Sequence, residues 1–393
     1  MNVSPLARLL GIAFVESLAT ALIERGLYFF SHERLGFTDA ENLGLALAFG
    51  AAYVAGAMAS HGLARRVSEK GLLAFAFVAQ FLVQTVVLLS LASWVVVAVN
   101  TCLGALMGLM WPVVESYISA GRRPSEQAAA VGRFNLAWAS AIPLGLLAAG
   151  PLIGLWSPSL FVAAACLNLV SLVLAWPLDR RPAHLAADHP ERPTPTALVR
   201  YRALLASSRW LMMASYCLLW TLAPLLPRVF TNLQIAVTTA TALSGLLDVF
   251  RGLTFLVLQI YVGWHSRRWP IVAAMFLLPV GFYGALFGPN VAAVLAGELL
   301  FGVGAGAVYY GALYYAMVVK NAAVEAGGAH EGIIGSAFVV GPLAGLVGNR
   351  LTRVLGGPFA GMLAGMGPVI VTCTAGAIWF LAKIAGKQAP RDA

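Results

Sequence analysis

The chain has 393 residues, of which 60% are hydrophobic and only 10% are charged, and its formal net charge is +9. A soluble protein carries about 25% charged residues, so the composition excludes a large soluble domain. The basic residues lie mainly in short segments between apolar runs, where they indicate membrane orientation rather than a nucleic-acid partner.

The apolar runs have the length that crosses a lipid bilayer as a helix, about 20 residues. Transmembrane β-strands would instead give alternating segments of about ten residues, which the sequence lacks. We therefore expect an all-α polytopic membrane protein with about twelve spans, the first retained rather than removed as a signal peptide. The predicted limits are 7–31, 41–64, 71–90, 93–119, 127–153, 158–178, 209–229, 237–263, 269–288, 290–319, 331–349 and 360–385.

One long polar segment, from Asp179 to Arg209, interrupts the series and is rich in Pro, Arg and His. It divides the spans into six plus six. We predict an N-terminal six-helix bundle over 1–178, a cytoplasmic linker over 179–208 and a C-terminal six-helix bundle over 209–393.

Basic residues follow alternate spans, which indicates the orientation of the chain. Arg65 and Arg66 follow the second span, Arg122 follows the fourth and Arg267 the eighth, whereas most segments on the opposite side are short and nearly uncharged. Because positive charge favours the cytoplasmic side, we expect a multi-pass protein of the cell inner membrane with both termini in the cytoplasm.

The two halves repeat weakly but in order. Residues 61–67 (HGLARRV) align with 263–269 (GWHSRRW), and residues 104–108 (GALMG) align with 302–306 (GVGAG). A third match, of Ile142-Pro143 with Gly341-Pro342, falls at a similar offset of about 200 residues. Three ordered matches predict a duplication, with two bundles related by a pseudo-two-fold axis along the membrane normal.

With this layout, basic loops after the second and eighth spans, and a glycine- and proline-rich fifth span, the chain resembles the major facilitator superfamily. The resemblance implies a transporter, and residues 312–342 resemble a prokaryotic branch of that family without implying a substrate. The family's loop signature is kept at Leu63, Ala64, Arg66 and Lys70, but Arg65 stands where the family has an aspartate, so its gating salt bridges are not implied. Asn100 replaces the arginine linked to proton coupling in exporters, so standard drug/proton antiport is not implied either.

The eighth span carries Asp248 and Arg251 within an apolar run that also contains Gln259. A charge near a bilayer centre costs roughly 2.5 kcal/mol or more and usually marks an ion or substrate path. Residues three apart on a helix can partly neutralise each other. Arg251 is the best candidate to bind an anionic substrate group, because guanidinium presents a bidentate fork. The alternative is a purely structural pair that locks two helices.

Carboxyl groups within the spans are candidates for proton coupling. The candidates are Glu16, near the middle of the first span, Asp248 and Glu298. Burial favours the protonated form of a carboxyl group, so each could bind a proton. A hydrogen bond to a neighbouring helix is an equally weighted explanation for Glu16. Glu24 and Arg25, nearer the outer end of that span, are expected at a wet vestibule.

Two stripes at helical spacing are expected to face a central cavity, with glycines that allow close helix approach. The tenth span gives Glu298, Gly302, Ala305 and Tyr309, and the fourth gives Asn100, Gly104, Met107 and Trp111. Besides Arg251, the substrate-binding candidates are Trp111, Tyr309, Asn135, Trp138, Gln259 and Tyr310, although core packing is the commoner role of single aromatics. The candidate cytoplasmic gate or capping residues are Arg65, Arg66, Glu115, Arg133, Arg267 and Glu331.

The sequence thus favours a secondary active transporter that works by alternating access, is proton-coupled, and moves a small anionic or zwitterionic solute as a monomer. The aromatic and Met lining leaves an exporter of amphipathic drugs or lipids open. An integral-membrane enzyme and a non-transporting receptor are the alternatives from other classes. The sequence has no Walker loop, and its four cysteines lie far apart in apolar runs, so neither enzymatic activity, a cofactor nor a metal site is expected.

Overall fold

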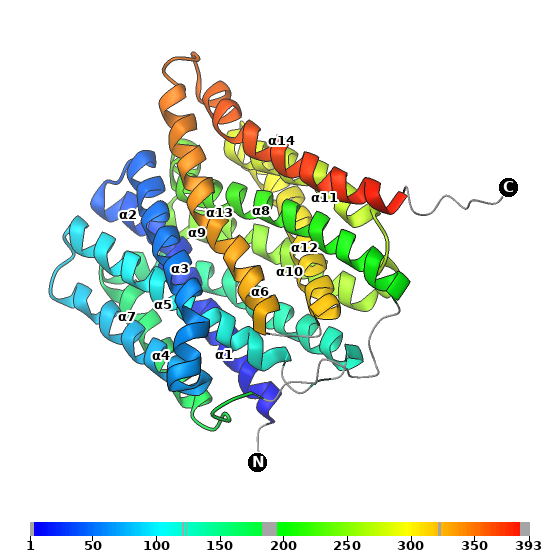
Figure 1. The fold of residues 1–393 in the computed structure, drawn as a ribbon. Helices are drawn as coiled ribbons and strands as arrows, with labels where there is room; N and C mark the ends of the chain where they lie inside the picture. The colour runs from blue at the N-terminus through cyan, green and yellow to red at the C-terminus, as the bar shows by residue number, and fades with distance from the viewer. Residues whose placement is uncertain (1–3, 120–121, 123, 183–194, 321–323, 386–393) are drawn as a thin grey trace.

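The computed structural model describes residues 4–119, 122, 124–182, 195–320 and 324–385, and every regular element in these ranges is a helix (Figure 1). Eleven helical segments are long and apolar enough to cross a membrane, and α7 is a shorter apolar helix. The predicted all-α polytopic fold is therefore confirmed.

The helices fall into two series along the chain. Before residue 183 they are α1 (Pro5–Thr20), the π-helical segment η1 (Ala21–Gly26), α2 (Leu27–Leu35), α3 (Asp39–Val67), α4 (Glu69–Thr85), η2 (Val86–Leu88), α5 (Ser93–Ser119), α6 (Pro124–Leu155) and α7 (Ser159–Ala175). After residue 194 they are α8 (Pro195–Asn232), α9 (Val237–Ser244), α10 (Leu246–Ile260), η3 (Val262–Trp264), α11 (Trp269–Phe287), α12 (Val291–Lys320), α13 (Val324–Leu351) and α14 (Pro358–Ala385).

Figure 1 shows the blue-to-cyan helices toward one side and the green-to-red helices toward the other, and α3 and α13 pack together where the two groups meet. The separation of the chain into two bundles of six stays a prediction. Residues 195–208, which we assigned to the linker, are corrected to the first turns of α8, since the proline at Pro195 is well placed to begin a helix. Residues 183–194 of the predicted linker lie outside the described residues.

Two spans predicted as single helices are interrupted. The first span passes through η1, where the helix widens by one residue. The eighth breaks at Gly245, which separates α9 from α10, and it ends at Ile260 rather than at residue 263. Both interruptions lie beside the cavity described below.

Close helix packing depends on the glycines predicted for that role. A Cβ atom at Gly104 of α5 would overlap the backbone carbonyl of Phe49 in α3, and one at Gly302 of α12 would overlap that of Leu247 in α10. The two helix pairs, α3 with α5 and α10 with α12, are among the most extensively packed in the protein. The predicted close approach is therefore confirmed, and it occurs at equivalent positions of the sequence repeat.

Candidate functional site

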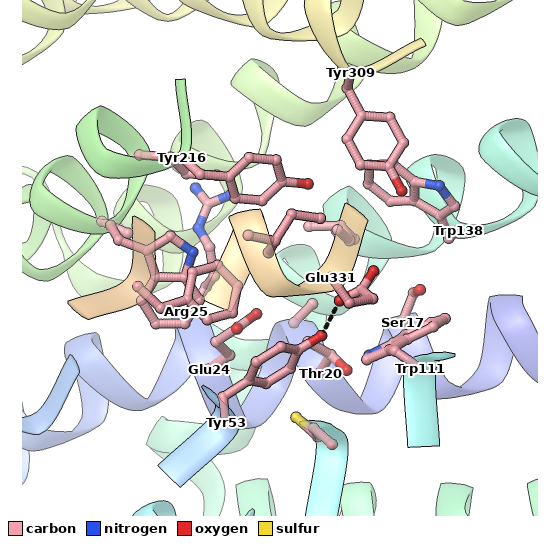
Figure 2. Close-up of a pocket in the computed structure, with 18 of the residues that line it drawn as sticks. Ser17, Thr20, Glu24, Arg25, Tyr53, Trp111, Trp138, Tyr216, Tyr309 and Glu331 are labelled. Carbon is pink, nitrogen blue, oxygen red and sulfur yellow. Dashed lines mark hydrogen bonds between the residues drawn. The ribbon is translucent and has the colours of Figure 1, made fainter. Parts of the chain in front are cut away.

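A cavity lies where helices from both halves of the chain meet (Figure 2). Its walls come from the first span and from α3, α5, α6, α8, α10, α12 and α13. The cavity volume is about 110 Å³, whereas pockets for drug-sized ligands have about 300–1,000 Å³. In this conformation the space therefore admits only a small solute, and a larger one requires the helices to move apart.

The charged centre of the site is Asp248, which is fully buried in the first turn of α10. A carboxylate at a helix N-terminus is stabilised by the helix dipole. Two arginines donate hydrogen bonds to it: Arg25 of η1 to Oδ2, and Arg251 of α10 to Oδ1. Arg25 also donates to the carbonyl oxygen of Ser244, the last residue of α9, at 3.0 Å. Arg25 thus bridges the break at Gly245 and joins the two halves of the chain.

The structure corrects the predicted position of Arg25. It is buried in an ion pair instead of lying at a wet vestibule, because the π-helical turn directs its side chain toward α10. Its neighbour Glu24 is half-buried and lines the cavity (Figure 2).

Arg251 lines the cavity against an aromatic wall. Its guanidinium carbon lies 4.6 Å from the ring centroid of Trp138, and its Nε atom has no hydrogen-bond partner among the described residues. The Trp138 ring packs edge-on against Tyr309 at 5.1 Å between centroids, and Tyr309 contacts Tyr216 at 6.1 Å. A cation held over an aromatic face in a dry site is stabilised by about 2 kcal/mol. One face of Arg251 is therefore fixed by packing.

Two carboxyl groups meet on another wall of the cavity. Glu115 of α5 and Glu331 of α13 are buried, line the cavity and share a hydrogen bond. The hydroxyl of Tyr53 in α3 donates to Glu331 Oε2 (Figure 2). A hydrogen bond between two carboxyl groups requires that one of them carry a proton as the donor. The pair thus brings two carboxyl groups together between helices of the two halves.

The prediction that Glu115 and Glu331 belong to a cytoplasmic gate stays a prediction, and only the capping role of Glu331 is corrected. Glu331 lies seven residues into α13, whose first residue is Val324, so it does not cap that helix. The other predicted gate residues, Arg65, Arg66, Arg133 and Arg267, are exposed.

The two predicted stripes reach the cavity only in part. Met107, Trp111 and Tyr309 line it. Asn100 instead donates to the carbonyl oxygen of Leu45 at 3.0 Å. Glu298 is buried beyond the cavity wall, against the backbone of Leu247, and neither carboxyl oxygen forms a well-aligned hydrogen bond with a described residue.

Other predicted residues support the wall from behind. Asn135 accepts a hydrogen bond from Trp138 Nε1 at 3.1 Å. Gln259 and the hydroxyl of Tyr310 lie against Gly132 of α6, and neither residue lines the cavity.

Glu16 does not line the cavity. The amide of Asn168 donates to both of its carboxyl oxygens at 3.2 Å, and Gln84 donates to Asn168 at 2.9 Å. This buried network joins α1, α7 and α4, which favours the structural explanation of Glu16.

The sequence interpretation missed Tyr53, Tyr216, Trp220 and Phe338, which line the cavity from α3, α8 and α13. Trp220 and Phe338 are in close ring contact, with centroids 3.8 Å apart. Each is an aromatic residue in an apolar run, and that pattern is the same for core packing and for a cavity wall.

Comparisons with known proteins agree with this architecture. The family model described as Major Facilitator Superfamily matches residues 7–345. No curated protein matches the sequence.

Among solved structures, the chain is similar to a bacterial homologue of the human lysosomal transporter Spinster in an inward-facing, unoccupied conformation. The TM-score is 0.68 and the sequence identity is 14%, and the match covers 96% of this chain and 94% of that one. It is also similar to the nucleoside transporter NupG (D323A mutant), with a TM-score of 0.65, 12% identity and coverage of 96% and 99%. The outward conformation of FucP gives a TM-score of 0.60, 12% identity and coverage of 96% and 99%. At these identities the neighbours show the fold alone.

The match of the family model over most of the chain confirms the resemblance found in the sequence: the chain belongs to the Major Facilitator Superfamily, a family of membrane transporters.

Proposed function

We propose that the protein is a secondary active transporter that moves a small solute across the inner membrane by alternating access, as a monomer with both termini in the cytoplasm. The observation that carries the proposal is a cavity between helices of the two halves that holds charged side chains of both signs. Ionisable groups inside a membrane protein are costly and usually mark a transport path.

The charges of the cavity favour a zwitterionic solute. Its lining includes two cations, Arg25 and Arg251, and three carboxyl groups, Glu24, Glu115 and Glu331. Because Asp248 already pairs with both arginines, the remaining donors of Arg251 suit one anionic group. A cationic group would interact with Glu24 or the carboxyl pair, and an apolar part with the aromatic wall.

The second candidate is an amphipathic cation or lipid-like compound. The excess of carboxyl groups over cations and the rings of Trp111, Trp138, Tyr216 and Tyr309 support it, since aromatic faces attract cations. A receptor that binds such a compound without moving it has the same cavity and differs only in transport.

We infer that transport is coupled to protons through Glu115 and Glu331, with Asp248 and Glu298 as further candidates. In this inference the two carboxyl groups share one proton, and moving α5 and α13 apart breaks the hydrogen bond that retains it. Glu16 is a weaker candidate for the proton carrier, because both of its carboxyl oxygens accept hydrogen bonds from Asn168.

A thermal-shift screen of the purified protein in detergent tests the substrate class. The compounds are amino acids, carboxylates, sugar phosphates and amphipathic cations, each tested against the wild type, Arg251→Ala and Arg133→Ala. A ligand at one hundred times its Kd stabilises the folded state by about 2.7 kcal/mol. We expect zwitterions to stabilise the wild type and Arg133→Ala, whose lost arginine is exposed, but not Arg251→Ala. Amphipathic cations that stabilise all three proteins equally would replace the zwitterion with the second candidate.

Counterflow in proteoliposomes with the best ligand then tests transport itself. Exchange of labelled for unlabelled ligand supports a transporter, whereas binding without exchange would leave a receptor. For Glu331→Gln we expect counterflow to persist and accumulation driven by a pH gradient to fail. Accumulation at the wild-type level would remove Glu331 from proton coupling.

A further inference from the structure

A second concavity, the basic groove, lies between α8, α13 and α14, near the start of α8 and the end of α14. It is lined by Arg202, Leu205, Ala206, Arg209, Trp210, Met213, Ile333, Ser336 and Phe380, and its volume is about 510 Å³. None of these residues lines the central cavity. The groove is therefore separate from the candidate transport site.

The described lining of the groove carries positive charge and no acidic residue. Arg202 and Arg209 lie seven residues apart on α8, so they share one face of that helix. The ammonium of Lys383 lies 5.0 Å from the ring centroid of Phe380, which places a third cation at the rim. None of the nine lining residues is acidic. The charge of the groove thus suits an anion.

Arg209 also has unused hydrogen-bond donors. Its Nε and Nη2 atoms are buried and have no partner among the described residues. The imidazole of His330 is also buried and lies within electrostatic range of this guanidinium, and neither of its ring nitrogens has a hydrogen-bond partner among the described residues. Buried donors of a charged group nearly always have an acceptor. A phosphate oxygen at this position would supply one.

Apart from Ser336, the remaining lining is mainly apolar and adjoins the outer surface of the protein. Leu205, Met213, Ile333 and Phe380 are hydrocarbon or aromatic, and Trp210 is 38% exposed. On α14, the neighbours Ile378 and Trp379 are exposed, as expected for a lipid-facing helix. A free phosphate ion would leave this apolar surface uncovered, whereas an acyl chain covers it.

We propose that the basic groove binds one anionic phospholipid, with its phosphate at Arg209 and Arg202 and an acyl chain along Met213 and Phe380. Basic pockets between transmembrane helices suit anionic lipid head groups in this way. The site is independent of the transported solute.

Lipid binding to the purified, delipidated protein in detergent tests the proposal. The probes are dioleoyl phosphatidylglycerol, dioleoyl phosphatidylcholine and inorganic phosphate, followed by thermal shift and by native mass spectrometry of retained lipid. We expect phosphatidylglycerol to raise Tm and to remain bound at one copy, and the other two probes to have a smaller effect. An equal effect of phosphatidylcholine, or of inorganic phosphate, would overturn the anionic-lipid assignment.

Three variants locate the site. Arg202→Gln removes a cation of the groove, and we expect about fivefold weaker phosphatidylglycerol binding, since a basic residue near a membrane surface contributes about 1 kcal/mol. Ala206→Trp fills the groove, keeps every charge and is expected to abolish the single-copy binding. The control Arg65→Gln removes an exposed arginine elsewhere and is expected to bind like the wild type. Equal losses in Arg65→Gln and Arg202→Gln, or unchanged binding in Ala206→Trp, would refute the proposal.

Discussion

The ion cluster of Arg25, Asp248 and Arg251 makes a quantitative prediction for Asp248→Asn. The buried carboxylate accepts one charge-assisted hydrogen bond from each arginine, and such bonds contribute about 1.5–3 kcal/mol each. Removing the charge leaves the two buried guanidinium groups without the carboxylate to which both are bonded. The sum of two bonds, about 3–6 kcal/mol, agrees with the loss of about 3–5 kcal/mol that follows when a buried pair loses one partner.

Single changes of the arginines are expected to cost less. Arg25→Gln leaves Asp248 paired with Arg251, and Arg251→Gln leaves it paired with Arg25, so each should lower the free energy of unfolding by about half the loss in Asp248→Asn. The control Asp39→Asn breaks the pair with Arg228, whose side chain is 60% exposed. Exposed pairs contribute about 0–1 kcal/mol.

Equilibrium unfolding in mixed detergent micelles measures these four variants against the wild type. The expected order of destabilisation is Asp248→Asn first, then the two arginine variants, then Asp39→Asn. If Asp248→Asn were no less stable than Asp39→Asn, the cluster would not hold α10 to the first span, and the structural argument built on Asp248 would be wrong.

Three further predictions use matched substitutions. Gly104→Ala should destabilise the protein by about 1–3 kcal/mol, because its Cβ would overlap the backbone of α3. In the control Gly62→Ala the Cβ meets open space, so this variant should be more stable by up to about 1 kcal/mol. Unfolding titrations measure both variants, and equal effects would refute the packing argument. Burial lowers the pKa of His265 below its usual value of 6.5, so the unfolded chain takes up a proton first and stability is lost as pH falls below about 6.5. His265→Gln should therefore flatten the profile of Tm against pH, and an unchanged profile would exclude this source. Glu16→Leu should lower the free energy of unfolding by about 1–3 kcal/mol, because it leaves the amide of Asn168 without its acceptor, and it should leave ligand binding unchanged. Weaker ligand binding by a variant of normal stability would return Glu16 to the transport path.

Most of the fold could be predicted because a membrane span is a local property of the sequence. Run length and charge located the spans, and Gly104 and Gly302 stood out because they recur at the repeat offset. The break at Gly245 could not be located in this way, since no proline lies near it in the eighth span. What bridges the break is Arg25, more than 200 residues earlier in the chain, through its bonds to Ser244 and Asp248. When the free carbonyl groups at a helix end accept hydrogen bonds from a side chain far away in the sequence, the residues of the helix itself do not indicate where it ends.

The candidate site could be predicted only where charge or repeat position separated a residue from the apolar background. Arg251 and Tyr309 were found on these grounds, and both line the cavity. Tyr53 and Tyr216 were missed because a single aromatic in an apolar run has the same pattern in a core as in a cavity wall. Their role depends on which helices face each other, which is a tertiary property.

The position of Arg25 shows a third way in which local pattern fails. Residues on a regular helix advance by about 100° each, so the face of any residue follows from its distance along the chain. The π-helical turn from Ala21 to Gly26 adds one residue to the first span and shifts every later side chain by about that angle. A regular helix would not place Arg25 on the same face. The inserted residue therefore converts a local pair, Asp248 with Arg251, into a cluster that connects the two halves of the chain beside the cavity.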